Sequence, residues 1–242
     1  MTRVFVPSEY DLSDRLVVLP PDDSAHVARV LRLRTGDALT VCDGAGGDYP
    51  SEIISLQGGL VTVRAGARIE NQAEPRLFAS LLLGIAKGDR MDYALQKAVE
   101  AGAGEIRPFV SARCIAKPKE NKHVRWQRIV QEAAAQSGRG RIPIVHLPVP
   151  LTEALAAADH CDARLFCYED ESQTSLRQAL ETMSPFASAA LVTGPEGGFS
   201  PEEAQTAARQ GYRAVSLGRR ILRCETAPVA ALSALLYHAG EM

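Results

Sequence analysis

From residue 77 onward, continuous apolar runs alternate along the chain with helical patterns. Short runs without polar alternation are typical of parallel strands that are buried on both faces. The segments between them repeat apolar residues with the period of a helix. Regular strand–helix alternation predicts an α/β domain with a mostly parallel sheet. The expected strands cover residues 77–85, 105–110, 142–147, 163–168, 189–193 and 213–217.

Four helices can be placed between or after these strands. Residues 91–99 carry an apolar stripe, and Gly102 lies just beyond it as a C-terminal signal. A second stripe comprises Val124, Ile129, Val130, Ala133 and Ala134. The segment Ser200-Pro201-Glu202-Glu203 is a capping box with proline at the first helical position, and Gly211 ends that helix. Residues 228–238 form the last expected helix.

The first 72 residues show a different pattern of predicted elements. Short segments rich in β-branched residues are separated by turn signals such as Asp43-Gly44-Ala45-Gly46-Gly47. One helical insert is expected over residues 22–32, and residues 70–75 form a polar linker. The sequence therefore predicts two domains, a small barrel-like β domain over 1–72 and the α/β domain over 73–242. The expected strands of the first cover residues 3–6, 15–19, 38–42, 49–55 and 60–65.

Composition and charge exclude several classes of protein. With 46% hydrophobic residues and a net charge of −2, the chain is not expected to be disordered. No apolar stretch is long enough to span a membrane. The five cysteines include no C-x-x-C pair, so neither a disulfide framework nor a zinc site is expected. We therefore expect a cytoplasmic protein without a metal.

One block of the sequence is basic. Residues 107–141 hold nine basic and two acidic residues, whereas the segments before 73 and after 146 are net acidic. A basic stripe on a nearly neutral protein favours a polyanionic partner on one face. The alternative is an ordinary solvated charged surface.

Two loops after expected strands are candidates for a ligand site, because α/β domains bind ligands beyond the carboxyl ends of their strands. The first is Thr193-Gly194-Pro195-Glu196-Gly197-Gly198-Phe199, whose glycines allow a close approach of backbone to ligand. The second runs from Leu217 to Ala227. Neither is a dinucleotide fingerprint or a phosphate loop. The carboxylate of Glu196 would repel a phosphate, so the ligand is not expected to be held by phosphates. A tight structural turn is the alternative.

The sequences of the two loops are similar to motifs of a known protein family. The motifs Gly194-Pro195-Glu196-Gly197-Gly198-Phe199-Ser200 and Leu217-Gly218-Arg219-Arg220-Ile221-Leu222-Arg223-x-Glu225-Thr226-Ala227 resemble the signature of the ribosomal RNA small subunit methyltransferase E family, which belongs to the SPOUT methyltransferases. The resemblance extends over nearly the whole chain. Cys224 departs from the family pattern, in which threonine is more usual. Other similar positions are Arg3-x-Phe5, Val30-Leu31-Arg32, Lys97-x-x-Glu100, Arg113, Glu132-Ala133-Ala134-x-Gln136-Ser137-x-Arg139 and Pro143.

This resemblance implies a fold and an activity. The first domain would be a PUA-like RNA-binding β-barrel, and the second an α/β SPOUT-type parallel sheet with a C-terminal trefoil knot. The protein would be a homodimer that methylates N3 of a uridine in 16S rRNA of the small ribosomal subunit, with S-adenosylmethionine as cofactor and without a metal. The implied cofactor-binding residues are Thr193, Gly194, Glu196, Gly197, Gly198, Leu217, Gly218, Ile221 and Leu222.

The resemblance and the basic block together suggest further roles. Arg3, Arg32, Arg113, Arg125, Arg128 and Arg139 are the expected RNA-binding residues. Uridine N3 must lose a proton before it can accept a methyl group, so Glu100 and Glu132 are candidate proton acceptors and Arg139 a candidate for stabilising the anion. Cys224 is expected to be a packing residue rather than a nucleophile, since attack by cysteine serves methylation at carbon. Trp126 is expected to be a core or dimer anchor.

Two other activities are compatible with the same features. One is a different SPOUT activity, such as ribose 2′-O-methylation of RNA. The other is a non-catalytic rRNA-binding assembly factor, against which the intact ligand loops argue.

Overall fold

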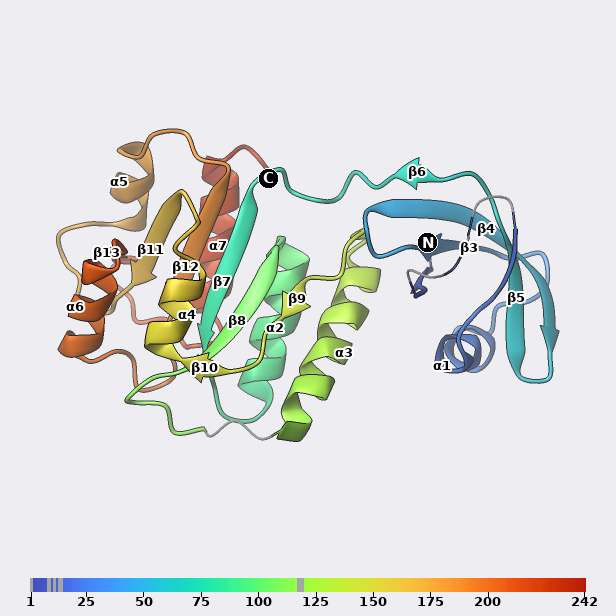
Figure 1. Cartoon of the computed structure of the whole chain (residues 1–242), viewed down its shortest axis with the longest axis horizontal. Helices are drawn as coiled ribbons and strands as arrows, with labels where there is room; N and C mark the ends of the chain where they lie inside the picture. The colour runs from blue at the N-terminus through green and yellow to red at the C-terminus, as the bar shows by residue number, and fades with distance from the viewer. Residues whose placement is uncertain (1, 8–9, 11, 13–14, 117–119) are drawn as a thin grey trace. The chain divides into compact units, whose positions relative to one another are not determined.

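The computed structural model describes residues 2–7, 10, 12, 15–116 and 120–242, and the side chains of residues 120 and 121 lie outside the description. Its contacts divide the chain into two compact units. The first comprises Met1–Glu74 and Ala134–Ile142, and the second Pro75–Ala133 and Pro143–Met242. Figure 1 shows both units and labels most of their elements.

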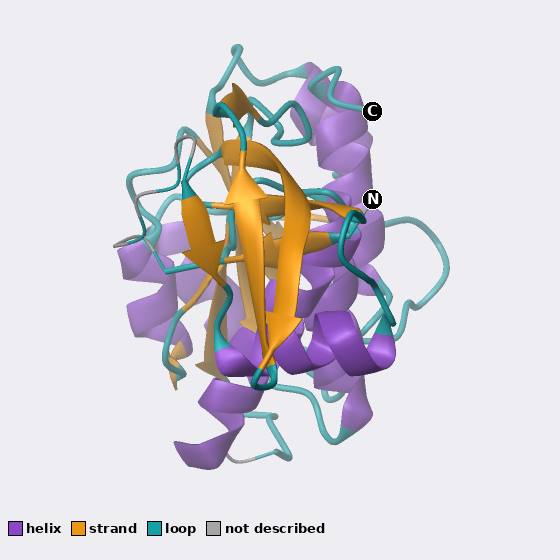
Figure 2. Cartoon of the chain, turned by 90° about the vertical axis from the view of Figure 1, so that its right-hand side faces the viewer, coloured by secondary structure: helices purple, strands orange, loops and turns teal. Residues whose placement is uncertain are grey.

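The first unit is a six-stranded sheet in the order β1-β3-β4-β5-β2, with β6 paired to β4. The pairing of β1 with β3 is parallel and the others are antiparallel. Figure 2 shows the curl of these strands in orange. Their bounds are β1 Arg3–Phe5, β2 Leu16–Val18, β3 Ala38–Cys42, β4 Gly47–Gln57, β5 Leu60–Ala65 and β6 Ile69–Glu70.

Alternating side chains of these strands fill the core of this unit. Leu39, Val41, Ile53 and Val63 are fully buried, together with Val27 from the helical insert. Within the described residues, backbone pairing does not join β1 to β2, so the barrel-like sheet is curled with two edges.

The expected helix over residues 22–32 has two parts. The α-helix α1 covers Pro21–Ala25, and a π-helical turn follows over His26–Val30. The turn ends before Arg32, which has a left-handed φ of 55°. Since a non-glycine residue avoids this conformation inside a helix, the helix ends earlier than the apolar pattern predicted.

Residues 134–142 group with the first unit although they follow the expected linker by about sixty positions in the sequence. Arg141 forms an isolated antiparallel bridge with Ala45, and the Gly46 N–H donates to the Gly140 carbonyl at 3.1 Å. The sequence analysis placed this segment in the second domain. Its separate grouping results from long-range pairing, which a local pattern does not report.

The second unit is built on a parallel sheet in the order β10-β8-β7-β12-β11-β13, with β9 also paired to β8. Every strand pair in it is parallel, which confirms the predicted mostly parallel α/β fold. The bounds are β7 Phe78–Gly84, β8 Glu105–Val110, β9 Ile144–Val145, β10 Val149–Pro150, β11 Ala163–Cys167, β12 Ser188–Thr193 and β13 Arg213–Val215.

The four expected helices are present, and two short helices were not predicted. The capping box that begins α6 has both of its hydrogen bonds. The unpredicted α5 also begins with a capping box, from Ser175 to Gln178, which was an available sequence signal. The bounds are α2 Asp89–Ala101, α3 Glu120–Gln136, α4 Leu151–Ala157, α5 Leu176–Glu181, α6 Pro201–Arg209 and α7 Ala227–His238.

The buried face of α3 differs from the predicted stripe. Val124 is 69% exposed, whereas Trp126 is 2% exposed and lies on the same face as Val130. The buried positions 126, 130, 133 and 134 keep the helical spacing, but the face is set by the large indole, because burying it removes the most apolar area from water. The prediction of Trp126 as a buried anchor agrees with this burial.

Candidate functional site

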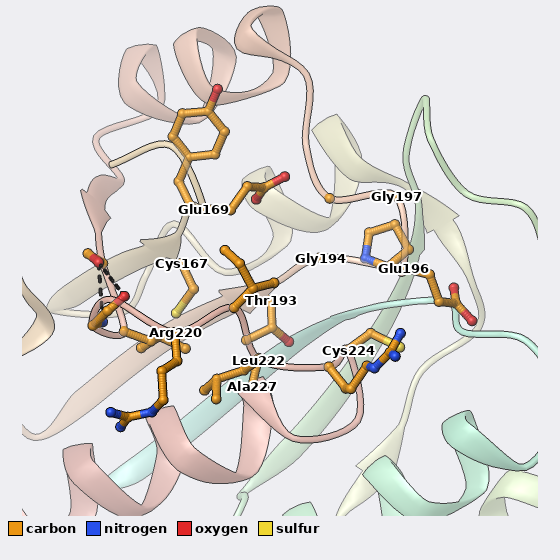
Figure 3. A pocket seen from close by; sticks show the side chains of 18 of the residues that line it. Cys167, Glu169, Thr193, Gly194, Glu196, Gly197, Arg220, Leu222, Cys224 and Ala227 are labelled. Carbon is orange, nitrogen blue, oxygen red and sulfur yellow. Dashed lines mark hydrogen bonds between the residues drawn. The ribbon is translucent and has the colours of Figure 1, made fainter. Parts of the chain in front are cut away.

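A cavity of about 290 Å³ lies at the carboxyl ends of β11, β12 and β13 in the second unit. Because β11 pairs with both other strands, the loops that follow all three strands meet at one edge of the sheet. Figure 3 shows the side chains around the cavity. The lining residues are Arg90, residues 167–169, residues 193–198, residues 216–218, residues 220–224 and Ala227.

All nine residues that the sequence analysis assigned to a cofactor line this one cavity. Six-residue β12 ends at Thr193, so the glycine-rich loop begins where the buried strand stops. The second loop leads from β13 into α7, whose first turn begins at Ala227. The structure thus brings together two motifs that are separated by about twenty residues in the sequence.

The glycine-rich loop is held by a carboxylate from the neighbouring strand. Gly198 has a φ of +64°, and a Cβ at this position would lie 1.6 Å from Oε1 of Glu169. The same Oε1 accepts a hydrogen bond from the Phe199 N–H at 2.9 Å. Phe199 itself is fully buried, with its ring centroid 4.2 Å from that of Phe166. The positive φ favours glycine here, and a Cβ would displace the Glu169 carboxylate from the Phe199 N–H.

Two other segments of the chain, at Gly84 and at Arg113, lie close to the backbone of the same loop. A Cβ on Gly84, at the end of β7, would lie 2.5 Å from the backbone nitrogen of Pro195. A Cβ on Gly197 would lie 2.8 Å from the Arg113 carbonyl oxygen, and Nη1 of Arg113 donates to the Gly197 carbonyl at 3.3 Å. The loop is therefore preorganised by protein contacts.

Glu196 is part of this support. Its Oε1 accepts hydrogen bonds from the Lys87 N–H at 2.8 Å and from Nη1 of Arg90 at 3.2 Å. Burial by itself raises the pKa of the Glu196 carboxyl, but these hydrogen bonds and the charge of Arg90 outweigh it and hold the pKa below its ordinary value. The carboxyl is ionised at neutral pH and ties the loop to the segment after β7.

Two polar atoms beside the cavity have no hydrogen-bond partner among the described residues. They are the hydroxyl oxygen of Thr193, a residue that is 0% exposed, and Oε2 of Glu196. A buried hydroxyl without a partner costs free energy unless a ligand or water satisfies it. The backbone of residues 219–222 also makes no backbone hydrogen bond within the described chain.

The opposite wall of the cavity is apolar. Leu217 and Leu222 are half-buried there, and Ile221 is 83% exposed at the cavity edge. Apolar walls with unpaired backbone groups at their edges suit a flat heteroaromatic ring, whose faces contact the side chains and whose edge pairs with the backbone.

The thiol of Cys224 is not arranged for nucleophilic attack. Burial and the neighbouring carboxylates raise its pKa to about 12, and it donates to Oε2 of Glu225 at 3.2 Å. Because the thiolate is the nucleophilic form, a thiol with this pKa is inert at neutral pH. This agrees with the predicted packing role.

The chain matches two families described as RNA methyltransferase domain, over residues 73–236, and RNA methyltransferase PUA domain, over residues 19–65. Among curated relatives, it is 35% identical to the ribosomal RNA small subunit methyltransferase E of Synechocystis sp., over 96% of this chain and 76% of that protein. It is 31% identical to the protein of the same name from Bacillus subtilis, over 88% and 86%. The chain belongs to the ribosomal RNA small subunit methyltransferase E family.

Solved structures of similar proteins agree with this membership. The methyltransferase E of Neisseria gonorrhoeae, bound to S-adenosyl methionine, is 33% identical with a TM-score of 0.89 over 98% of this chain and 97% of that one. A Legionella pneumophila methyltransferase in complex with the same cofactor is also 33% identical, with a TM-score of 0.88 over 98% and 97%.

Three residues that the family resemblance suggested for catalysis do not line the cavity of their own chain. Glu100 accepts from Nζ of Lys97 at 2.8 Å, near the end of α2. Glu132 accepts from Nε of Arg128 at 3.0 Å on an exposed part of α3. Arg139 lies in the first unit. Glu100 and Glu132 belong to the second unit, and neither is among the residues that line its cavity.

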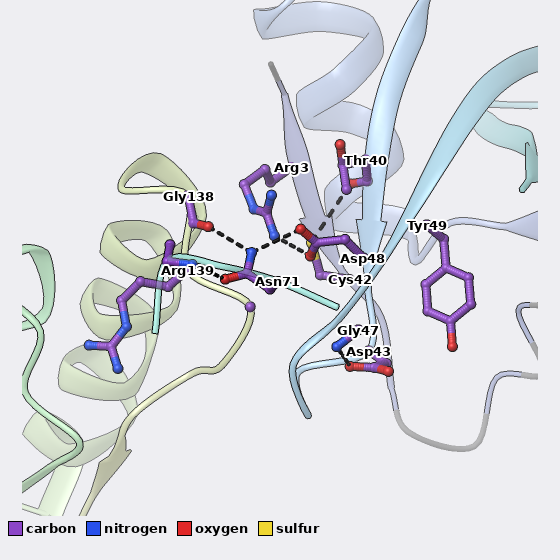
Figure 4. A network of polar contacts seen from close by, with 12 residues as sticks. Arg3, Thr40, Cys42, Asp43, Gly47, Asp48, Tyr49, Asn71, Gly138 and Arg139 are labelled. Atoms are coloured by element: carbon purple, nitrogen blue, oxygen red, sulfur yellow. Dashed lines mark hydrogen bonds and ion pairs between the residues drawn. The ribbon is translucent and has the colours of Figure 1, made fainter. Parts of the chain in front are cut away.

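Arg139 is held in a buried ion pair. Its Nη2 donates to Oε2 of Glu74 at 2.8 Å and its Nε to Oε1 at 3.3 Å. Oε1 also accepts from the backbone N–H groups of Gly140 and Arg141. Figure 4 shows Arg139 beside Asn71, whose side chain donates to the Gly138 carbonyl at 3.0 Å. These contacts give Arg139 a structural role in the first unit.

The other predicted RNA-binding arginines belong to both units and have different partners. Arg3 is paired with Asp48 inside the first unit (Figure 4). Arg32 is exposed, Arg113 contacts the glycine-rich loop, and Arg125 pairs with Asp92. Four of the six predicted arginines therefore have a carboxylate partner in the chain, namely Arg3, Arg125, Arg128 and Arg139. These partners lower the net positive charge that the four arginines present to a ligand.

Sequence reasoning missed several lining residues. Tyr168 ends the expected strand 163–168 and Glu169 directly follows it, so the rule of strand carboxyl ends could have found both. Arg90 is remote in the sequence, and no local signal pointed to it. Among the described residues no group of three or more potential metal ligands occurs, and no helix is long and apolar enough to cross a membrane.

Proposed function

We propose that this chain transfers a methyl group from S-adenosylmethionine to N3 of a uridine in 16S ribosomal RNA of the small ribosomal subunit. The observation that carries the proposal is the cavity between the glycine-rich loop and residues 217–224, where both motifs of the methyltransferase E family meet. The relatives crystallised with this cofactor support it.

The residues around the cavity fit S-adenosylmethionine. Leu217, Ile221 and Leu222 would contact the faces of the adenine, and the unpaired backbone of residues 219–222 would bind its edge. The unpartnered Thr193 hydroxyl would hydrogen-bond to the cofactor. The carboxylates of Glu169 and Glu196 suit a ligand with a positive charge. When bound, the cofactor supplies a methyl group that its sulfonium makes electrophilic.

The remaining chemistry concerns the proton on uridine N3. Neutral N3 is a poor nucleophile, so a base must remove the proton or a cation must stabilise the anion. We propose Glu100 or Glu132 as the acceptor and Arg139 as the stabilising cation. Since these residues do not line the cavity of their own chain, this role requires that they reach the cavity of a second copy.

We therefore also propose a homodimer, with the C-terminal segment forming the trefoil knot of SPOUT methyltransferases. Light scattering on the full chain tests the dimer. A monomer at micromolar concentration would contradict both the dimer and the catalytic assignment of Glu100, Glu132 and Arg139. It would leave cofactor binding unaffected.

The test of the activity is methyl transfer from labelled S-adenosylmethionine to small ribosomal subunits that lack the modification, followed by nucleoside analysis. Recovery of 3-methyluridine is the expected result. A 2′-O-methylated nucleoside would indicate a different RNA methyltransferase. Binding of 16S rRNA without binding of the cofactor would indicate an assembly factor.

A further inference from the structure

The arginines of the second unit fall into two groups. Thirteen arginines belong to this unit. Ten of them donate to a carboxylate, hydroxyl or carbonyl oxygen of another described residue. The other three have no such partner in the part of the chain that the structure describes. They are Arg219, Arg220 and Arg223.

All three lie within a stretch of five residues, in the loop that borders the cavity. Arg220 and Arg223 are among its lining residues, and all three are exposed. In Figure 3 the guanidinium of Arg220 extends away from Glu169 and Glu196. This segment has no acidic residue before Glu225, which accepts instead from the Cys224 thiol. The loop therefore carries three uncompensated positive charges next to the candidate methyl-transfer site.

The charge is larger than the cofactor needs. S-adenosylmethionine has one carboxylate and a positive sulfonium, so it can neutralise one guanidinium at most. Arg219 does not line the cavity at all. Guanidinium groups bind phosphate through two parallel hydrogen bonds, and an RNA strand offers one phosphate per nucleotide. A polyanion matches three neighbouring arginines better than a single small ligand does.

An apolar side chain lies among these arginines. Ile221 is 83% exposed between Arg220 and Leu222, in the segment that lines the cavity. Proteins that recognise single-stranded RNA contact the unstacked bases with flat or apolar side chains and the phosphates with arginines. This loop presents three exposed arginines, with the exposed side chain of Ile221 beside Arg220.

We propose that residues 219–223 bind the phosphate backbone of a single RNA strand at the edge of the cavity. The proposal rests on the function proposed above and adds to it the surface that holds the substrate strand. The six arginines expected to contact RNA, four of them in the basic block at 107–141, mostly have partners within the protein. Among the described residues, the arginines of the loop 219–223 have no such partner.

The test replaces Arg219, Arg220 and Arg223 together by glutamine in the full chain. Binding of a 16S rRNA transcript is measured by filter retention or fluorescence at several salt concentrations, and binding of S-adenosylmethionine by calorimetry. We expect RNA affinity about tenfold weaker or more at low salt. We also expect the slope of log K against log[salt] to fall by about 0.7 for each lost phosphate contact, about 2 in all.

The matched control is R177Q/R209Q/R213Q, which removes the same charge from the same unit. These arginines donate to Glu181, Thr206 and Thr182 and lie outside the cavity lining. We expect this control to keep the wild-type slope to within about 0.5, because it removes no phosphate contact.

The outcomes separate the two proposals. If the wild type binds both RNA and cofactor but the loop variant keeps its salt slope, the loop proposal is wrong and the proposed function stands. The loop proposal is also wrong if the variant loses cofactor affinity alone, because the arginines then bind the cofactor carboxylate. If the wild type binds no RNA, the proposed function is wrong and the loop proposal with it.

Discussion

Glu169 lies so close to Gly198 that a methyl group on Gly198 would overlap its Oε1, at 1.6 Å. The carboxylate occupies this place because it accepts the Phe199 N–H at 2.9 Å, while the Phe199 ring is anchored in the core. Two of the three glycines in the family motif are thus favoured by the protein itself, Gly197 by its contact with the Arg113 backbone and Gly198 by its positive φ beside Glu169. Glycine in this loop shapes the cavity as well as allowing approach of a ligand.

The substitution G198A should therefore abolish cofactor binding without unfolding the chain. The positive φ alone costs an alanine about 1–2 kcal/mol, and the overlap displaces either Glu169 or the loop. We expect at least about a hundredfold weaker binding of S-adenosylmethionine by calorimetry, which corresponds to about 2.8 kcal/mol. The control G58A has a similar φ of +61° with nothing within 4 Å, and should bind normally. Unchanged affinity in G198A would show that the loop is not held as described.

The substitution T193V tests whether the Thr193 hydroxyl faces a ligand. Valine keeps the shape of the side chain and removes a buried hydroxyl that has no protein partner. We expect the melting temperature to stay the same or rise, because no hydrogen bond within the protein is lost. Cofactor affinity should fall about tenfold, as expected for a lost hydrogen bond of about 1–1.5 kcal/mol. A lower melting temperature with normal affinity would instead assign the hydroxyl to the fold.

The Glu74–Arg139 ion pair should stabilise the first unit. Its side chains are only 18% and 5% exposed, and Glu74 also accepts two backbone N–H groups. Removing one partner leaves a buried charge, so R139Q should lower the free energy of unfolding by about 3–5 kcal/mol.

Denaturant unfolding of R139Q measures this, with R128Q as control. The Arg128–Glu132 pair is exposed, so R128Q should change stability by less than about 1 kcal/mol. If R139Q is as stable as the wild type but loses methyl transfer, Arg139 acts in catalysis as the family resemblance suggested, and its ion pair is incidental.

Glu196 should make the fold more sensitive to acid. Its pKa is lowered in the folded chain, so its contribution to stability is present above its ordinary value near 4.5 and is lost as the pH falls below it. At pH 7 we expect E196Q to be less stable than wild type by about 1–2 kcal/mol, since charged hydrogen bonds are lost. The difference should shrink towards pH 3.

Thermal unfolding at several pH values checks this prediction. E153Q, on the first turn of α4, is the control because Glu153 makes no hydrogen bond or ion pair with the described residues. A stability difference for E196Q that stays constant from pH 7 to pH 3 would contradict the role of the ionised carboxyl.

The sequence by itself determined the elements and the two ligand loops. Buried parallel strands are read from continuous apolar runs, and α6 from its capping box, because these signals act between neighbours in the chain. The short α4 and α5 lack two full helical periods, and the buried face of α3 follows Trp126, so local patterns missed them. The family motifs predicted the cavity lining, since each motif is contiguous.

Only the tertiary structure decided which charged side chains are paired within the protein and which are left to bind a partner. The pairing of Glu74 with Arg139 spans 65 positions, and that of Arg90 with Glu196 spans 106. No period or motif reports such pairs, because they depend on how the strands are ordered in the sheet. Within the described part of the chain, the same pairings leave Arg219, Arg220 and Arg223 without a hydrogen-bond or ion-pair partner. A basic residue is visible in the sequence, but whether its charge is compensated is a property of the fold.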